Sequence, residues 1–276
     1  MNKFLSFLTV IILSFFVNSC VTNITNKKIK FPTESFVKFE HMAYQKLCEP
    51  DNENNMDDDC YRFLTGALGS GAIVGISLNG SYVLTAAHIC NREPSTYDRL
   101  FKEGEERNLV NKFFIYDIDE IKYSAEILKY NDEQDICLTH VWGLFGPVLK
   151  ISSVGPEIGD IVYNMAAPAG FMTKRMVPLF DGFYSGEYRE VSIYTLPAVG
   201  GSSGSPIMNE KGELIGLVFA RHVRFHHIVL SPRYIKLRNF IFSAIKEHTE
   251  SVAKKHNFPD ERGIDIRFTP EVKNLF

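Results

Sequence analysis

The sequence predicts an all-β fold that ends in one helix. Short apolar segments follow one another at close spacing and are interrupted by Gly, Pro or Asp/Asn clusters, a pattern typical of barrels or sandwiches rather than βαβ units. The chain has 276 residues, 45% hydrophobic and 23% charged, enough for one large all-β domain or two small packed barrels. The clearest segments are 112–118, 123–128, 136–142 and 161–166.

Two hairpins are predicted from turn residues between apolar runs. Residues 70–78 and 81–84 are joined by Asn79-Gly80, a dipeptide that favours the tight turn of a β-hairpin. Residues 206–208 and 213–219 flank the polar turn at 209–212 in the same way.

A helical pattern follows the last predicted strand, over residues 232–246. Ser231-Pro232 supplies a cap and a first-turn proline. The apolar residues of the segment recur at helical spacing and form one face. They are Leu237, Ile241, Ala244 and Ile245.

Three short motifs supply the partners of one reaction. A serine hydroxyl is a weak nucleophile until a histidine takes its proton, and that histidine needs a carboxylate to orient it. Leu84-Thr85-Ala86-Ala87-His88 offers the histidine, Asp135-Ile136-Cys137-Leu138 the carboxylate, and the glycine-rich turn Gly201-Ser202-Ser203-Gly204-Ser205-Pro206 the serine. Each motif alone is common, but the three in this order point to a serine hydrolase.

These motifs resemble those of the chymotrypsin-fold (trypsin-like) serine proteases. That family has T-A-A-H at its histidine, D-[IL]-x-L at its aspartate and G-x-S-G-[GS]-P at its serine, in this chain order. The sequence is nearer to the bacterial HtrA-like and glutamyl-endopeptidase-like branch than to the digestive enzymes. The resemblance implies two packed six-stranded antiparallel β-barrels with a C-terminal α-helix over residues 63–247, without a PDZ domain.

The resemblance also implies the role of each residue. Ser203 is the expected nucleophile, His88 the general base and Asp135 the residue that orients it, while the backbone N–H groups of Gly201 and Ser203 form the oxyanion hole. Asp132 competes for the carboxylate role, but the apolar run after Asp135 favours Asp135 as the entrance of a buried strand. No metal or organic cofactor is implied, and the expected partner is a protein or peptide substrate.

The expected specificity pocket lies on two segments. Pro197 occupies the position of the aspartate of trypsin-type enzymes, which argues against cleavage after Lys or Arg. Phe219 and Ala220 favour medium apolar residues, whereas the basic stretch from Arg221 to His227 makes acidic residues the second choice. The predicted substrate-binding residues are Pro197, Ala198, Val218, Phe219, Ala220 and Arg221.

Two other functions remain open at this point. One is a catalytically silent member of the family that binds peptide in the same groove. The other is a serine esterase, although its nucleophile normally lies in a turn between strand and helix. A net charge of −3 gives no support to nucleic-acid binding.

The N-terminal segment predicts export from the cytosol. Residues 1–20 form a signal peptide, with an apolar run over 4–17 that is too short to span a bilayer comfortably. Val17-Asn18-Ser19-Cys20 resembles a bacterial lipoprotein box, so either Cys20 is lipidated or ordinary cleavage occurs nearby. The enzyme is thus expected in the periplasm, at the cell surface or secreted, with membrane contact only through an anchor at Cys20.

The remaining cysteines and flanking segments complete the predictions. Residues 21–62 are expected to be a polar leader and residues 248–276 a charged tail. Cys48 and Cys60 bracket a loop with six acids and no base, which a disulfide would close; a calcium site is the alternative, without the EF-hand spacing. Cys90 and Cys137 either pair or lie buried as small apolar side chains, and we favour burial.

Overall fold

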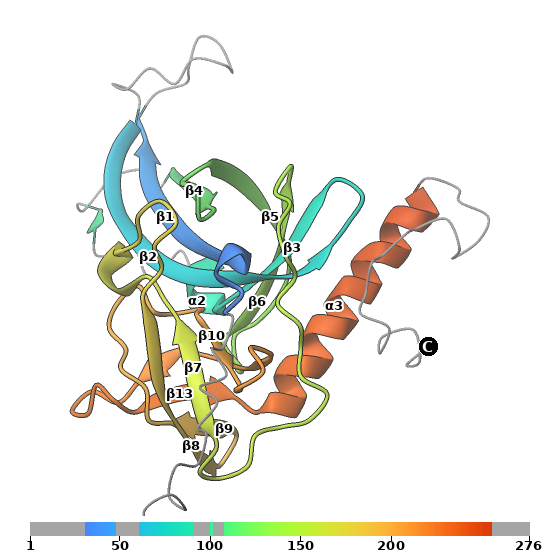
Figure 1. Ribbon diagram of the computed structural model, residues 1–276. Helices are drawn as coiled ribbons and strands as arrows, with labels where there is room; N and C mark the ends of the chain where they lie inside the picture. The colour runs from blue at the N-terminus through green and yellow to red at the C-terminus, as the bar shows by residue number, and fades with distance from the viewer. Residues whose placement is uncertain (1–30, 48–60, 91–99, 102–107, 256–276) are drawn as a thin grey trace, which may run out of the picture. The chain divides into compact units, whose positions relative to one another are not determined.

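Strands are the main regular structure in the part of the chain that the computed structural model describes, which comprises residues 31–47, 61–90, 100–101 and 108–255. One long helix follows the strands (Figure 1). The predicted signal peptide, Cys20, the Cys48 to Cys60 segment and the tail from residue 256 lie outside the described residues.

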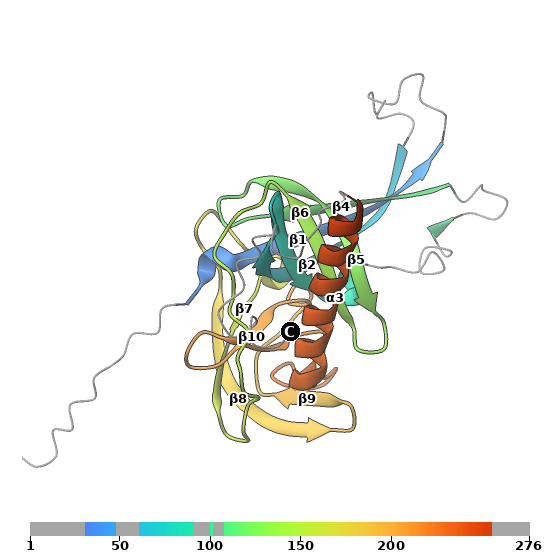
Figure 2. The ribbon, with the colours of Figure 1, turned by 90° about the vertical axis from the view of Figure 1, so that its right-hand side faces the viewer.

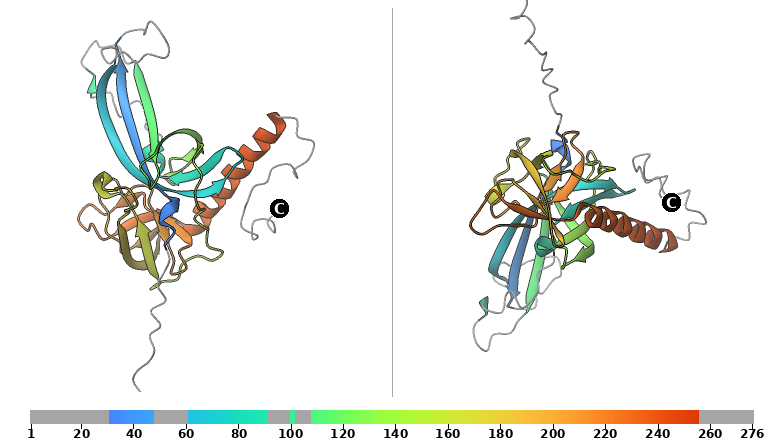
Figure 3. Two further views of the ribbon diagram at one scale, coloured as in Figure 1. Left: turned by 45° about the horizontal axis from the view of Figure 1, so that its top comes forward. Right: turned by 90° about the horizontal axis from the view of Figure 1, so that it is seen from below.

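The first sheet closes into a six-stranded antiparallel barrel in the order β1-β2-β3-β6-β5-β4. A buried apolar cluster fills its interior and includes Val37, Ile73, Val83, Ile115 and Val141. Figure 3 shows β1, β2 and β4 running together as the long curved side of this barrel. The strands are β1 (Phe36–Lys46), β2 (Tyr61–Ile76), β3 (Gly80–Thr85), β4 (Leu109–Tyr116), β5 (Lys122–Asn131) and β6 (Ile136–Trp142).

Strand β1 lies within the segment that we expected to be a polar leader, ahead of the predicted domain start at residue 63. Its side chains alternate, so that Val37 and Phe39 lie in the barrel core. Lys38 and Glu40, on the other face, form an ion pair 3.5 Å apart. The charged residues of this segment therefore belong to the outer face of a barrel strand, whereas His41 and Gln45 are buried on the other face.

The second sheet has seven strands in the order β11-β10-β7-β8-β9-β13-β12. Its strands are β7 (Ile161–Met165), β8 (Leu179–Tyr188), β9 (Val191–Tyr194), β10 (Pro206–Met208), β11 (Leu214–Leu217), β12 (Ala220–Arg221) and β13 (Val229–Pro232). The all-β class and the first barrel are confirmed. The ends of the second sheet approach each other, because Leu217 N–H of β11 donates to the side chain of Ser231 on β13 at 2.9 Å.

Helix α3 (Tyr234–Lys255) confirms the predicted C-terminal helix and is longer than the pattern indicated. Ser231 and Pro232 belong to β13, so the predicted cap is wrong. The predicted apolar face is confirmed, because its four residues are all buried. Residues 248–255, expected to be tail, continue the helix, which Figure 2 shows along its length. No helix in the described part of the chain has the length and apolarity to cross a membrane.

One apolar core joins the barrel, the second sheet and α3. Leu84 and Leu138 of the barrel, Met165 and Met208 of the second sheet and Ile241 of α3 belong to the same buried cluster. The two sheets are therefore fixed relative to each other by packing, so the residues at their junction have defined positions.

Candidate active site

Strand pairing brings the predicted histidine and aspartate to the same end of the barrel. Strands β3 and β6 are antiparallel neighbours, with Thr85 opposite Cys137. His88 follows β3 in the short helix α2 (Ala87–Cys90), and Asp135 immediately precedes β6. Asp135 has a positive φ of 52°, a conformation that Asp tolerates better than most residues.

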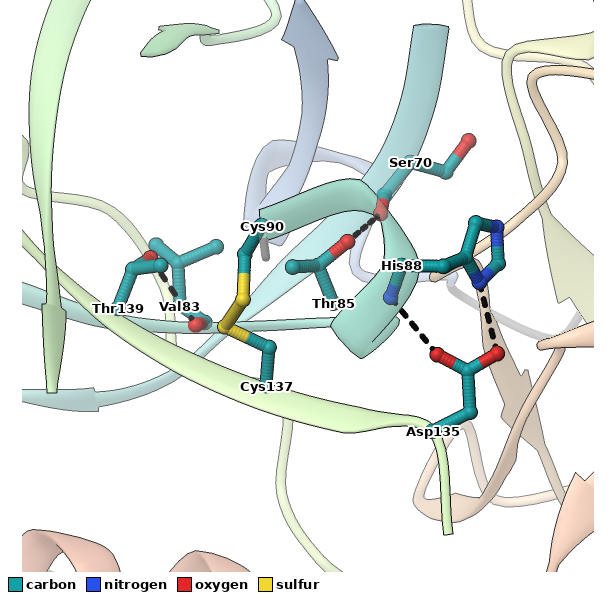
Figure 4. The surroundings of a disulfide bond; sticks show 8 residues. All are labelled: Ser70, Val83, Thr85, His88, Cys90, Asp135, Cys137 and Thr139. Carbon is teal, nitrogen blue, oxygen red and sulfur yellow. Dashed lines mark hydrogen bonds and ion pairs between the residues drawn. A yellow bond between two sulfur atoms is a disulfide. The ribbon is translucent and has the colours of Figure 1, made fainter. Parts of the chain in front are cut away.

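His88 and Asp135 are in direct contact. The Nδ1 atom of His88 lies 2.7 Å from Oδ2 of Asp135, and the backbone N–H of His88 donates to Oδ1 at 2.9 Å (Figure 4). The His88 side chain is 41% exposed and that of Asp135 19%, so the ring is accessible while the carboxylate is largely covered. Asp132, the competing candidate, is exposed in the preceding turn.

A disulfide joins the same two segments. Cys90, two residues after His88, is bonded to Cys137, two residues after Asp135. Both cysteines are buried, so burial is confirmed, but our preference for unpaired thiols was wrong. The sequence shows that each cysteine follows a predicted catalytic residue by two positions. Pairing, however, depends on the approach of β3 to β6, which only the fold reveals.

The predicted nucleophile lies where the second sheet meets the barrel. Ser203 is partly exposed, and its carbonyl accepts a hydrogen bond from Ser70 N–H of β2 at 2.7 Å. The next residue, Gly204, has a φ of 84°, and a Cβ there would lie 2.2 Å from Thr85 Oγ1 and 3.0 Å from Ala86 N. Glycine is thus required twice, by its backbone angle and by close packing against the segment that leads to His88.

The peptide groups before Ser203 have defined orientations. The Gly200 carbonyl accepts a hydrogen bond from Ala169 N–H at 2.6 Å. Because the N–H and C=O of one peptide point in opposite directions, this bond turns the Gly201 N–H away from Ala169. Among the described residues, the N–H groups of Gly201 and Ser203 donate to no other backbone group, so both can donate to a bound oxygen.

The predicted pocket residues lie on two hydrogen-bonded segments. Ala198 and Val218 are buried, whereas Arg221 is exposed and Pro197, Phe219 and Ala220 are partly exposed. Ala198 N–H donates to the His226 carbonyl at 3.0 Å, which connects the first segment to the β12–β13 hairpin. The assignment of these residues to a specificity pocket stays a prediction.

Sequence reasoning missed two buried polar residues behind the serine turn. Asn164 of β7 is fully buried, and its Nδ2 donates to Ser205 Oγ at 2.8 Å and to the Pro206 carbonyl at 2.9 Å. Ser70, also fully buried, bonds to the turn through its side chain and its backbone. A polar residue within an apolar run was the available signal for both. Within the described residues, no group of three or more His, Cys, Asp or Glu side chains is placed to hold a metal ion.

Comparison with known proteins identifies the family and the fold. The model of the trypsin-like peptidase domain matches residues 69–217. A solved structure, the serine endoprotease from Yersinia pestis, matches with a TM-score of 0.55 at 17% sequence identity, covering 83% of this chain and 69% of that chain. This structural likeness shows the shared fold. A comparison with curated proteins gives no match.

The fold and the family match define a serine-type peptidase, a hydrolase. The chain belongs to the trypsin-like peptidase domain family, because the match covers more than half of its length.

Proposed function

We propose that the chain is a serine endopeptidase that cleaves peptide bonds through an acyl-enzyme intermediate. Ser203 Oγ attacks the scissile carbonyl carbon, His88 takes the hydroxyl proton and delivers it to the leaving amine, and water then hydrolyses the acyl ester. The N–H groups of Gly201 and Ser203 stabilise the oxyanion. The observation that carries the proposal is the 2.7 Å contact between His88 and Asp135 in a chain of this family.

This contact supports a specific proton arrangement on His88. A carboxylate can only accept, so Nδ1 carries the hydrogen that is shared with Asp135 Oδ2. The neutral ring then has its basic lone pair on Nε2, which is the atom that must accept the proton of Ser203. Asp135 also stabilises the imidazolium that forms during attack.

The two rival functions are less well supported. A silent peptide-binding protein would not need a histidine paired with a largely covered aspartate beside a serine turn. An esterase of the strand-to-helix type has its nucleophile before a helix, whereas β10 follows Ser203. The absence of an esterase elbow makes peptides the preferred substrate class.

Labelling with a fluorophosphonate probe tests the proposed nucleophile. The unmodified protein should be labelled at Ser203, as located by peptide mass spectrometry, and Ser203→Ala should lose the label. Ser153→Ala, a change of an exposed serine outside the site, should be labelled normally. His88→Ala should lose peptidase activity to the same level as Ser203→Ala, within an order of magnitude. Labelling that persists in Ser203→Ala would refute the assignment.

We also propose that the enzyme is exported. The Cys90–Cys137 disulfide supports this proposal, since disulfides persist mainly in oxidising compartments outside the cytosol. Mass spectrometry of the mature N-terminus distinguishes the two forms expected at Cys20, a lipid-modified cysteine or an ordinary cleavage end. A mature protein that starts at Met1 would refute export by a cleaved signal.

A further inference from the structure

Ser70 of barrel strand β2 makes four hydrogen bonds, and two of them reach the nucleophile turn. Its backbone N–H donates to the Ser203 carbonyl at 2.7 Å, and its own carbonyl accepts from Thr85 Oγ1 at 2.8 Å. Its hydroxyl lies between Ala167 N–H, at 2.9 Å, and the Gly201 carbonyl, at 2.8 Å. The residue is fully buried, so water cannot replace these partners.

The direction of the hydroxyl bonds is fixed. Ala167 N–H can only donate, so Ser70 Oγ accepts there and gives its single hydrogen to the Gly201 carbonyl. One hydroxyl thus holds two loops of the second sheet: the start of the 3-10 turn η5 (Pro168–Gly170) and the glycine turn before Ser203.

These two loops also contact each other at the expected oxyanion-binding peptide. Ala169 N–H, in η5, holds the Gly200 carbonyl at 2.6 Å. Gly201 has a φ of 93°, and a Cβ at that position would lie 2.5 Å from the Ala167 carbonyl. The close approach requires glycine, and glycine makes rotation of the neighbouring peptides easy once their carbonyls are released.

We propose that Ser70 is a positioning residue that keeps the oxyanion-binding peptide in its productive orientation. Its hydroxyl fixes the Gly201 carbonyl and the beginning of η5, and η5 in turn fixes the Gly200 carbonyl, so the Gly201 N–H faces the substrate oxygen. Without the hydroxyl, the peptide between Gly200 and Gly201 can rotate and present a carbonyl where a donor is needed. This inference rests on the proposed function and extends it to a residue outside the three motifs.

Kinetics of Ser70→Ala test the proposal. The variant should lower kcat about 10- to 100-fold, less than the roughly 10²- to 10³-fold loss on removing an oxyanion donor outright, while KM for a peptide substrate stays within about twofold. Affinity for a peptide boronic acid, which forms a tetrahedral adduct with the serine, should fall by the same factor as kcat. A residue that only supports the fold would not change these two quantities together.

Ser81→Ala is the matched control. Ser81 is also fully buried in the barrel, and its hydroxyl donates to the Leu144 carbonyl at 2.7 Å. Its removal should lower the melting temperature without changing kcat or boronic acid affinity. If Ser70→Ala loses stability like Ser81→Ala but retains normal kcat, the proposal is overturned.

A second pair of variants covers the case in which Ser70→Ala does not fold. Ser70→Thr and Ser70→Val have nearly the same shape and differ in the hydroxyl, so their kcat ratio isolates the two hydrogen bonds. We expect a ratio of at least about 10, and a ratio near one overturns the proposal. Absence of fluorophosphonate labelling in the unmodified protein would instead refute the proposed function, which separates the two failures.

Discussion

Asp135 accepts two hydrogen bonds from His88, one on each carboxylate oxygen. The ring Nδ1 contacts Oδ2 and the backbone N–H contacts Oδ1. The backbone bond fixes the carboxylate relative to α2, so the ring bond has a defined geometry rather than a rotating partner. Because each carboxylate oxygen has a defined partner, the effect of replacing one oxygen with an amide nitrogen can be predicted.

Asp135→Asn should lower kcat by a factor on the order of 10⁴. The backbone N–H of His88 must still find an acceptor, so the amide oxygen takes that position and the amide NH₂ faces Nδ1. Nδ1 must then accept, which moves the ring proton to Nε2 and leaves His88 unable to take the proton of Ser203. Steady-state kinetics on a peptide substrate measure the effect.

Asp132→Asn is the control for this change. Asp132 is exposed in the same turn, and its variant should retain normal kcat. Asn also tolerates the positive φ at position 135, so Asp135→Asn should have a circular dichroism spectrum like that of the unmodified protein. A tenfold or larger loss in Asp132→Asn would contradict our choice between the two aspartates.

Reduction of the Cys90–Cys137 disulfide should destabilise the fold. The bond spans 47 residues, and the chain-entropy model then gives about 4 kcal/mol of stabilisation. The Cys90→Ala/Cys137→Ala variant should therefore melt roughly 10 °C lower. Reductant should lower the melting temperature of the unmodified protein by a similar amount and leave that of the variant unchanged. If the unmodified protein melts at the same temperature with and without reductant, the bond is absent in solution.

His140 should make the fold acid-sensitive. Burial and, to a smaller extent, the nearby His248 lower the pKa of His140 to about 4, while Glu126 opposes the shift. Its ring Nε2 lies 2.7 Å from Ser77 Oγ, and among the described residues its buried Nδ1 has no partner. A second ring proton would therefore have no acceptor.

The sign of the effect follows from the lowered pKa. The unfolded chain takes up a proton on this histidine near pH 6.5, whereas the folded protein does so only near pH 4. The contribution of neutral His140 to the free energy of unfolding is thus fully present above pH 6.5 and falls as the pH drops towards 4. The total loss from this residue is about 3 kcal/mol. Urea unfolding at several pH values measures this effect, and the free energy of unfolding of His140→Gln should depend less on pH than that of the unmodified protein. The control His222→Gln, at an exposed histidine, should match the unmodified protein.

The sequence predicts much of this site because its signals are local. The hairpin turn at Asn79-Gly80 places a strand directly before His88, and the apolar run after Asp135 marks the entrance of β6. Motifs of this kind depend on the chemistry of adjacent residues, which can be judged without knowing the fold. The all-β class followed from the same local patterns.

Features that depend on distant segments could not be predicted in the same way. β1 was missed because polar residues are spread along it and include the buried His41 and Gln45, which interrupt the alternating apolar signal of Val37, Phe39 and Ala43. Pairing of Cys90 with Cys137 needed the register of β3 on β6. The proposed role of Ser70 depends on strand β2 and two loops that meet only in the folded chain.

The cleavage preference is the prediction that depends most on side-chain surroundings. Of the predicted pocket residues, Ala198 and Val218 are buried and apolar. Residues 221–227, with two arginines and three histidines, are all exposed. We therefore expect cleavage after medium apolar residues first and after Glu or Asp second, with the basic stretch attracting acidic side chains at the rim.

Profiling with peptides that vary only at the cleaved position measures this preference. Arg221→Gln should reduce kcat/KM for cleavage after Glu or Asp about three- to tenfold, because it removes a charge from β12 at the pocket, while cleavage after apolar residues stays within twofold. Arg224→Gln removes an equally exposed charge from the turn beyond β12 and should have a smaller effect. Strong cleavage after Lys or Arg would show that Pro197 does not occupy the position that determines specificity.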